Sequence, residues 1–355
     1  MKQACIVISD VHLGNWECNH KEFCYFLEWI RDLANQPKVI KCKDKNITIK
    51  NPDKIILLGD ILELWNPKNG DRNNVLKDCI RPFSLLSNLD CDKIYVVGNH
   101  DDSVGELEGK FDCETLGNGT KFEIYSGHYP KNQKMTGVSN GLKIGNRSYF
   151  FLHGHQLDKE QAIIRSVSSF WDPINWFQDL FNVTFTKKYW KVNFVIFLSM
   201  LLCAKYFFWS EFLKSSLMGN LGWVMITGFF ALSSIPGIVA NTQGVIYNYA
   251  RPMDKTAEQV IQHKYYQKNK ETFDADVVVF GHTHFASSYV LKTEEGKKLF
   301  LNSGCWVGKD IEYNGIMCYA NTFIYLDESG AYILTWRGFD KIECIEAFME
   351  VDPKI

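Results

Sequence analysis

Five short apolar runs that each end in a polar cluster constrain the fold of this 355-residue chain more than any other feature. They cover residues 4–9, 54–58, 93–97, 148–152 and 276–280, and each is followed at once by Asp, Gly, Asn or His. Such β-branched runs are typical of buried strands that end in loops. Helical spacing at 23–33 and 76–89, and strand-like runs at 298–302, 316–326 and 331–336, complete the pattern. We therefore predict an α/β fold, a β-sandwich flanked by helices.

The composition excludes several classes of protein. Hydrophobic residues make up 46% and charged residues 23%, which excludes a disordered chain or a fibrous rod. The formal net charge of −2 and the lack of a basic run argue against a nucleic-acid partner. Eleven cysteines, an odd number without a CxxC pair, argue against a disulfide framework and a zinc knuckle and favour a reducing compartment.

One region departs from the globular pattern. Residues 215–250 contain no Asp, Glu, Lys or Arg, and residues 192–209 are apolar apart from three positions. These lengths predict a helical hairpin with spans at about 192–209 and 217–240, inserted as residues 171–253 into a globular domain of 1–170 and 254–355. Basic flanks at Lys187, Lys188 and Arg251 place the globular domain on the cytoplasmic side of the cell membrane. A buried helix pair and a hairpin lying in the membrane interface are the alternatives.

Six of the nine histidines follow the predicted strands, together with carboxylates and an amide. Loops beyond the carboxyl ends of strands in an α/β sheet converge, so these side chains can meet. Such a mixed oxygen and nitrogen ligand set suits Mn²⁺, Fe or Zn²⁺. The ligands outnumber the needs of one ion, and Asp60, after Gly59, is the predicted carboxylate that bridges two. The candidate residues are Asp10, His12, Asp60, Asn99, His100, Asp101, His153, His155, His282 and His284.

The motifs DxH, GD, GNHD, HGH and GHTH, in this order, resemble the calcineurin-like metallophosphoesterase superfamily over residues 1–157 and 274–336. The resemblance implies one metal held by Asp10, His12, Asp60 and His284, and another held by Asp60, Asn99, His153 and His282. It also implies that His100 contacts the phosphate and protonates the leaving oxygen, with Asp101 orienting its ring. His155 matches a position that is not usually a ligand, so we expect it to support the centre.

A narrower resemblance is to UDP-2,3-diacylglucosamine pyrophosphatases, which are similar at 9–13 (SDVHL) and 58–65 (LGDILELW) and in a hydrophobic lid at the same interval. That family commonly has Arg at the position of His100 and reads HGD where this chain reads HGH. The nucleotide-lipid substrate is therefore not transferred with the fold.

The sequence thus predicts a di-metal phosphohydrolase or pyrophosphatase in which a metal-bridged hydroxide attacks phosphorus. Two divalent ions are expected, Mn²⁺ first and Fe or Zn²⁺ as alternatives, with the lipid bilayer as a partner and a lipid-linked substrate. A soluble phosphoester cut by a merely anchored enzyme, and an inactive scaffold, are the competing hypotheses. No oligomeric state is predicted. Candidate substrate-binding residues are Glu63, Trp65, His155, Lys187, Lys188 and Arg251, although Glu63 and Trp65 equally fit capping and packing of a helix.

Overall fold

The structure is a computed structural model that describes residues 3–43, 45–107, 109–113, 120–130, 141–157, 195, 199, 255–262, 275–293, 296–313, 315–339 and 341–349. Apart from Val195 and Ser199, these residues belong to one compact unit, Met1–Asp158 with Pro252–Ile355.

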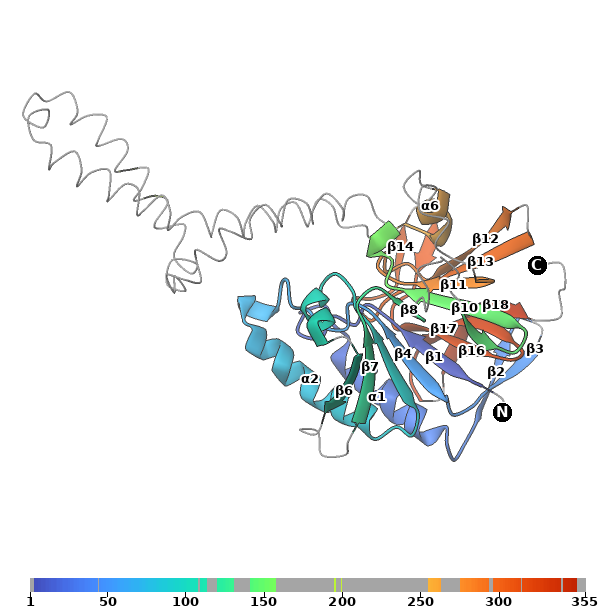
Figure 1. Ribbon diagram of the computed structural model, residues 1–355, viewed down its shortest axis with the longest axis horizontal. Coiled ribbons are helices and arrows are strands. Elements are labelled where there is room, and N and C mark those ends of the chain that lie inside the picture. The colour runs from blue at the N-terminus through green and yellow to red at the C-terminus, as the bar shows by residue number, and fades with distance from the viewer. Residues whose placement is uncertain are drawn as a thin grey trace, which may run out of the picture. The chain divides into compact units, whose positions relative to one another are not determined.

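Two β-sheets form the centre of the unit (Figure 1). The larger, eight-stranded sheet has the order β18-β17-β16-β1-β4-β5-β7-β6. Its strands are β1 (Cys5–Ile8), β4 (Lys54–Leu58), β5 (Asp92–Val96), β6 (Gly109–Cys113), β7 (Thr120–Tyr125), β16 (Thr322–Asp327), β17 (Gly330–Trp336) and β18 (Ile342–Met349). The strands β1, β4, β5 and β7 are parallel to one another, so their carboxyl ends share one edge of the sheet.

The second, six-stranded sheet has the order β12-β13-β11-β10-β8, with β9 paired to β10. Its strands are β8 (His128–Tyr129), β9 (Leu142–Ile144), β10 (Arg147–Leu152), β11 (Val277–Phe280), β12 (Ser287–Thr293) and β13 (Gly296–Asn302). The strands β10, β11 and β13 are parallel. Two hairpins complete the described strands: β2 (Lys38–Cys42) with β3 (Lys45–Ile49), and β14 (Ile311–Tyr313) with β15 (Ile316–Cys318).

Alternating side chains of the central strands explain the layers. In β1, Cys5 and Val7 pack between the two sheets against residues such as Phe151 of β10. The intervening residues Ile6 and Ile8 face the opposite side, where the helices α1 (His20–Asp32) and α2 (Arg72–Ser87) cover the larger sheet. A short helix, α6 (Ala257–Gln262), packs on the outer face of the smaller sheet. This is the α/β sandwich that the sequence predicts.

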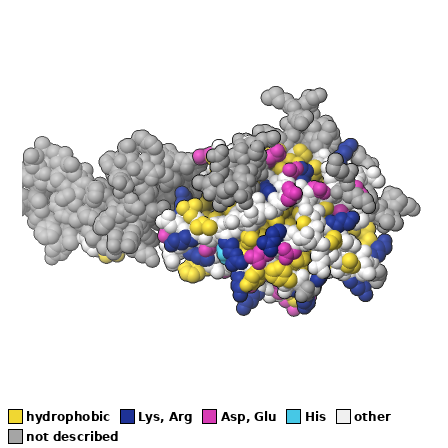
Figure 2. Space-filling model, turned by 90° about the horizontal axis from the view of Figure 1, so that it is seen from below, with side chains coloured by type: hydrophobic (Ala, Val, Ile, Leu, Met, Phe, Trp, Pro, Cys, Tyr) yellow, Lys and Arg dark blue, Asp and Glu magenta, His cyan; other side chains and the backbone are white. Residues whose placement is uncertain are grey.

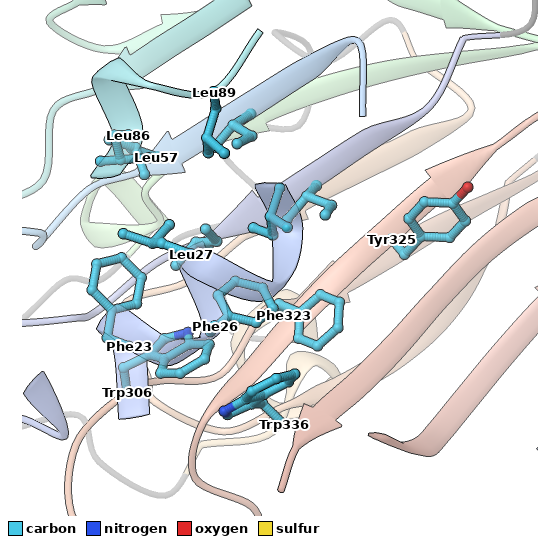
Figure 3. Close-up of a cluster of buried hydrophobic side chains, with 14 of the residues drawn as sticks. Phe23, Phe26, Leu27, Leu57, Leu86, Leu89, Trp306, Phe323, Tyr325 and Trp336 are labelled. Atoms are coloured by element: carbon cyan, nitrogen blue, oxygen red, sulfur yellow. The ribbon is translucent and has the colours of Figure 1, made fainter. Parts of the chain in front are cut away.

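The core under α1 is aromatic. Phe26 packs against three aromatic rings (Figure 3). Its ring centroid lies 4.8 Å from that of Trp306, 4.7 Å from that of Phe323 and 5.5 Å from that of Trp336. Since Trp306 belongs to the loop after β13, this cluster joins α1, the larger sheet and a loop from the smaller sheet.

Short 3-10 turns, η1 (Lys68–Gly70), η2 (Asp102–Leu107) and η4 (His155–Leu157), follow β4, β5 and β10.

Two sequence expectations need correction. The run 316–326 is two strands, β15 and β16, because the chain turns at Asn321, whose φ of 55° is left-handed. Cysteine spacing predicted no disulfide framework, yet Cys42 of β2 and Cys344 of β18 form a disulfide across 302 positions. This bond ties the β2–β3 hairpin to the edge strand of the larger sheet.

The predicted apolar hairpin, 171–253, lies outside the described residues except for Val195 and Ser199. Within the part of the chain that is described, no helix is long and apolar enough to span a membrane.

Candidate metal centre

The candidate residues come from loops at the carboxyl ends of five strands. The loop after β1 carries Asp10 and His12, the loop after β4 carries Asp60, and the loop after β5 carries Asn99 to Asp101. In the smaller sheet, the loops after the parallel strands β10 and β11 carry His153 with His155, and His282 with His284. The convergence of these loops follows from the parallel pairing, as the sequence predicts.

The first cluster consists of Asp10, His12 and His284. The Nε2 atoms of His12 and His284 lie 3.2 Å apart, and Oδ1 of Asp10 lies 3.2 Å from Nε2 of His284. Oδ2 of Asp10 accepts hydrogen bonds from the Ser9 hydroxyl and, at 3.0 Å, from the backbone N–H of His282. Oδ1 is buried and has no hydrogen-bond partner, so it points into the cluster.

The second cluster consists of Asp60, His153 and His282. Asn99 belongs to it as well, because its Oδ1 lies 3.2 Å from Nε2 of His153 and 3.1 Å from Nδ1 of His282. The Nδ1–H of His153 donates to the carbonyl of Leu58 at 2.8 Å, which directs Nε2 of that ring toward the cluster.

Asp60 lies between the two clusters. Its Oδ2 is 3.1 Å from Nε2 of His153 in the second cluster and 3.9 Å from Nε2 of His12 in the first. Its Oδ1 accepts a hydrogen bond from the backbone N–H of His100 at 2.8 Å. The carboxylate is therefore held in one orientation with one oxygen toward both clusters.

Glu63 has a role that the sequence did not predict. Its Oε2 lies 3.0 Å from Nδ1 of His12, and its Oε1 lies 2.8 Å from Nδ1 of His100. The side chain is buried, and it is not the cap of η1 or α2, whose N-caps are Pro67 and Asp71. By accepting both Nδ1–H groups, Glu63 turns Nε2 of each ring toward Asp60.

Asp101 does not orient His100, contrary to the sequence-based expectation. Its Oδ1 accepts from the backbone N–H of Gly98 at 2.7 Å. Its Oδ2 accepts from the Tyr95 hydroxyl at 2.6 Å and from the backbone N–H of Ile61 at 2.8 Å. Asp101 is thus a buried brace between the loops after β4 and β5, and the carboxylate that orients His100 is Glu63.

The carboxylates and imidazoles of the centre shift one another's protonation. Burial by itself would raise the pKa of Asp60, but His153 and His100 outweigh it and lower that pKa well below its usual range. Burial would likewise lower the pKa of His153, but Asp60 and Asp10 outweigh it and raise the value to about 10. The pKa of His100 is also raised, since Asp60 and Glu63 outweigh burial. The centre therefore favours positive charge beside its carboxylates.

Backbone geometry brings the ligand atoms together. Asp10, His12, Asp60, His282 and His284 all have left-handed φ values between 52° and 69°, a region that few residues other than glycine adopt. A Cβ at Gly98 would overlap Oδ1 of Asp60, so only glycine lets the loop after β5 approach this carboxylate.

The residues fit a pair of divalent ions. Asp10 Oδ1 is a buried acceptor without a hydrogen bond, and Nε2 of His284 lies 3.2 Å from it. The donor set of carboxylate, amide and imidazole atoms is one that Mn²⁺, Fe and Zn²⁺ take. Asp10, His12, Asp60 and His284 would hold one ion, and Asp60, Asn99, His153 and His282 the other.

The remaining predicted residues lie in different surroundings. Trp65 is 38% exposed and stacks on His100 with ring centroids 4.9 Å apart. His155 is buried, and its ring centroid lies 5.5 Å from that of His153. Lys187, Lys188 and Arg251 lie outside the described residues.

The sequence did not predict the residues that hold the GHTH motif, 281–284, in place. Asn302, at the end of β13, donates from Nδ2 to the carbonyl of Gly281 at 2.9 Å and to the Thr283 hydroxyl at 2.8 Å. The Ser303 hydroxyl lies 2.7 Å from that of Ser9, which in turn holds Asp10. Asn302 and Ser303 follow a strand in the same way as the ligands, and this position was the one available signal.

Comparison with known proteins assigns the family. The profile described as calcineurin-like phosphoesterase matches residues 5–286. A search of curated proteins finds no match. Among solved structures, a conserved uncharacterised protein (predicted phosphoesterase) from Streptococcus pneumoniae is similar at 14% identity and a TM-score of 0.29, covering 97% of this chain and 98% of that one. A dimetal phosphatase from Danio rerio is similar at 10% identity and a TM-score of 0.38, covering 98% and 99%.

The chain belongs to the calcineurin-like phosphoesterase family, because the family profile covers most of its length. The histidine and carboxylate clusters lie within the residues that the profile matches. The protein is accordingly a metal-dependent phosphoester hydrolase that uses two divalent ions.

Proposed function

We propose that this enzyme cleaves a phosphoester or pyrophosphate bond of a lipid-linked substrate at the cytoplasmic face of the cell membrane. The single observation that supports the lipid is the position of the uncharged stretch, 215–250, between the motifs of His153 and His282, which lie in one cluster. A water-soluble substrate would gain little from an apolar insertion at this place in the chain, other than the anchoring of its enzyme.

The described residues that precede and follow the insertion support the proposal. The described chain stops at Leu157, in the turn η4 that contains His155, and apart from residues 195 and 199 resumes at Lys255. The carbonyl of Lys255 accepts a hydrogen bond at 2.8 Å from the hydroxyl of Thr283, the residue between His282 and His284. Leu157 and Lys255, the described residues of the catalytic unit on either side of 171–253, thus both lie next to loops of the metal centre.

Bound divalent ions supply Lewis acidity toward the phosphoryl oxygens and lower the pKa of water. The protein's own contribution is positioning and proton transfer. His100 would hold a proton at Nε2 for the leaving oxygen, because Glu63 accepts from its Nδ1 and fixes the ring. Asn99 would hold one ion and orient the phosphate. Mn²⁺ is the proposed native metal.

The nucleotide-lipid pyrophosphates of the UDP-2,3-diacylglucosamine type are the narrower candidate substrates. The run 58–65 supports them, and it contributes Asp60, Glu63 and Trp65 to the site. His100 stands where that family commonly has Arg, so we expect the leaving group to be contacted by a different side chain than in that family. An inactive scaffold is disfavoured, because the described centre retains each ligand that the family motifs require.

The test compares the parent with a variant whose residues 192–250 are replaced by a Gly/Ser linker. Both proteins, loaded with Mn²⁺, are assayed on a soluble aryl phosphoester and on a lipid-linked pyrophosphate in mixed micelles. Selective loss of lipid-substrate turnover is the expected result. Equal turnover of both substrates by both proteins would overturn the lipid proposal and leave the hydrolase intact.

A further inference from the structure

The outward face of α2 has an unusual composition. Its exposed residues fall at positions 72, 73, 76, 77, 80 and 81, which form a single stripe along the helix. Leu76 is 67% exposed and Ile80 is 66% exposed, and Arg72, Lys77 and Arg81 lie beside them. The stripe contains two large aliphatic side chains and three cations, and no carboxylate.

The nearby acidic groups lie off this stripe. Asp78 is turned inward and pairs with Lys68 at 2.7 Å, and Glu28 of α1 pairs with Arg81 at 2.8 Å. Asp71 is exposed at the amino end of α2, where its carboxylate accepts from the backbone N–H of Asn73. Arg72 and Lys77 have no ion-pair partner within the ranges that the structure describes. The face therefore presents net positive charge.

Exposed tryptophans continue this face toward the metal centre. Trp16, in the loop after β1, is 72% exposed, and the Lys68 ammonium lies 5.8 Å from the centroid of its ring. The backbone N–H of Lys68 donates to the carbonyl of Gly14 at 2.8 Å, which joins this loop to η1, the turn that precedes α2. Trp65, in the loop after β4, stacks on His100. We call Trp16, Trp65, Leu76, Ile80, Arg72 and Lys77 the α2 face.

We propose that the α2 face binds an anionic lipid surface and brings the metal centre to the level of the lipid head groups. Aliphatic side chains flanked by Lys and Arg, with exposed tryptophans, are the pattern of protein surfaces that lie in a membrane interface. The absence of carboxylates from the stripe makes the face complementary to anionic lipid. Figure 2 shows hydrophobic and basic side chains side by side, with some acidic ones among them, on the side of the unit that α1 and α2 cover. The inference holds for a lipid-linked or a soluble substrate.

The experiment is lysine acetylation of the full chain, read by mass spectrometry, with and without vesicles. Vesicles of phosphatidylcholine with phosphatidylglycerol should slow the acetylation of Lys77 by about threefold or more, and vesicles of phosphatidylcholine alone should not. Lys292, exposed on β12, is the internal control and should react at an unchanged rate. High salt should weaken the protection, because exposed charges are screened.

A double variant tests the aliphatic part of the face. Leu76→Ser with Ile80→Ser should restore the acetylation of Lys77 in the presence of anionic vesicles. The matched control changes two exposed aliphatic residues elsewhere, Ile311→Ser and Ile316→Ser, and should keep the protection. Hydrolysis of a soluble phosphoester should be unchanged in both variants.

Three outcomes would overturn the proposal. Lys77 that reacts equally fast with and without anionic vesicles would exclude the face from the membrane. Equal slowing of Lys77 and Lys292 would indicate adsorption without a preferred face. Protection that depends on protein concentration and not on lipid would assign the face to a second copy of the chain. The first two leave the hydrolase proposal untouched, since its test is turnover.

Discussion

Glu63 connects the proposed metal ligand His12 with the proposed proton donor His100, because its two oxygens contact the two rings. Glu63→Gln keeps the size of the side chain but can accept from only one of the two Nδ1–H groups. We expect a 10- to 100-fold lower metal affinity, about the range for lost support of a metal-bound histidine, together with a fall in turnover. Titration with Mn²⁺ and a phosphoester assay measure the two effects.

The control for this variant is Glu17→Gln, an exposed carboxylate in the loop after β1. The Glu17→Gln protein should retain the parent's metal affinity and its turnover. A Glu63→Gln protein with the parent's metal affinity would show that His12 does not depend on Glu63.

Replacement of His100 should lower turnover without lowering the metal content. His100→Ala removes the proposed proton donor, so turnover should fall by about 10²- to 10⁴-fold. The metal content should stay at the parent's value, because Glu63 keeps its bond to His12 and Oε1 still accepts from the backbone N–H of Asn66. Metal analysis of the purified variant checks this. Loss of metal in this variant would make His100 a ligand.

At the scale of elements, Asp101 braces two loops of the larger sheet. Asp101→Asn places an amide N–H₂ group among the donors Tyr95, Gly98 and Ile61, so at least one buried donor loses its acceptor. We expect a loss of about 1–3 kcal/mol in the free energy of unfolding, measured by urea denaturation. A variant with unchanged stability and low turnover would instead support the role that the family resemblance implied.

The strands and the ligand loops were predictable because their signals are local. The runs at 54–58 and 276–280 correspond to β4 and β11, and the motif after each supplies a ligand. The roles of Glu63 and Asp101 were not predictable, since both are carboxylates near His100 in space and only the loop geometry decides which one contacts its ring. The disulfide of Cys42 with Cys344 depends on a pairing across 302 positions, which no local pattern encodes.

At the scale of the whole molecule, metal binding should contribute to stability. Asp10 and Asp60 are buried carboxylates, and removing the ions leaves their charges to be balanced by histidines alone. Excess EDTA should lower the unfolding midpoint, since an ion at a hundredfold excess over its dissociation constant contributes about 2.7 kcal/mol per site. Differential scanning calorimetry measures the shift. Identical midpoints with Mn²⁺ and with EDTA would contradict a metal-stabilised centre.

The central claim is that one carboxylate, Asp60, is shared by two divalent ions, and counting the metals tests it most directly. Oδ2 of Asp60 faces both clusters, so Asp60→Ala removes a ligand from each. Elemental analysis after equilibrium dialysis against Mn²⁺ should find two ions per chain in the parent, and the Asp60→Ala protein should lose both and all hydrolysis. A parent that holds one ion, or a variant that keeps two, would contradict the shared ligand.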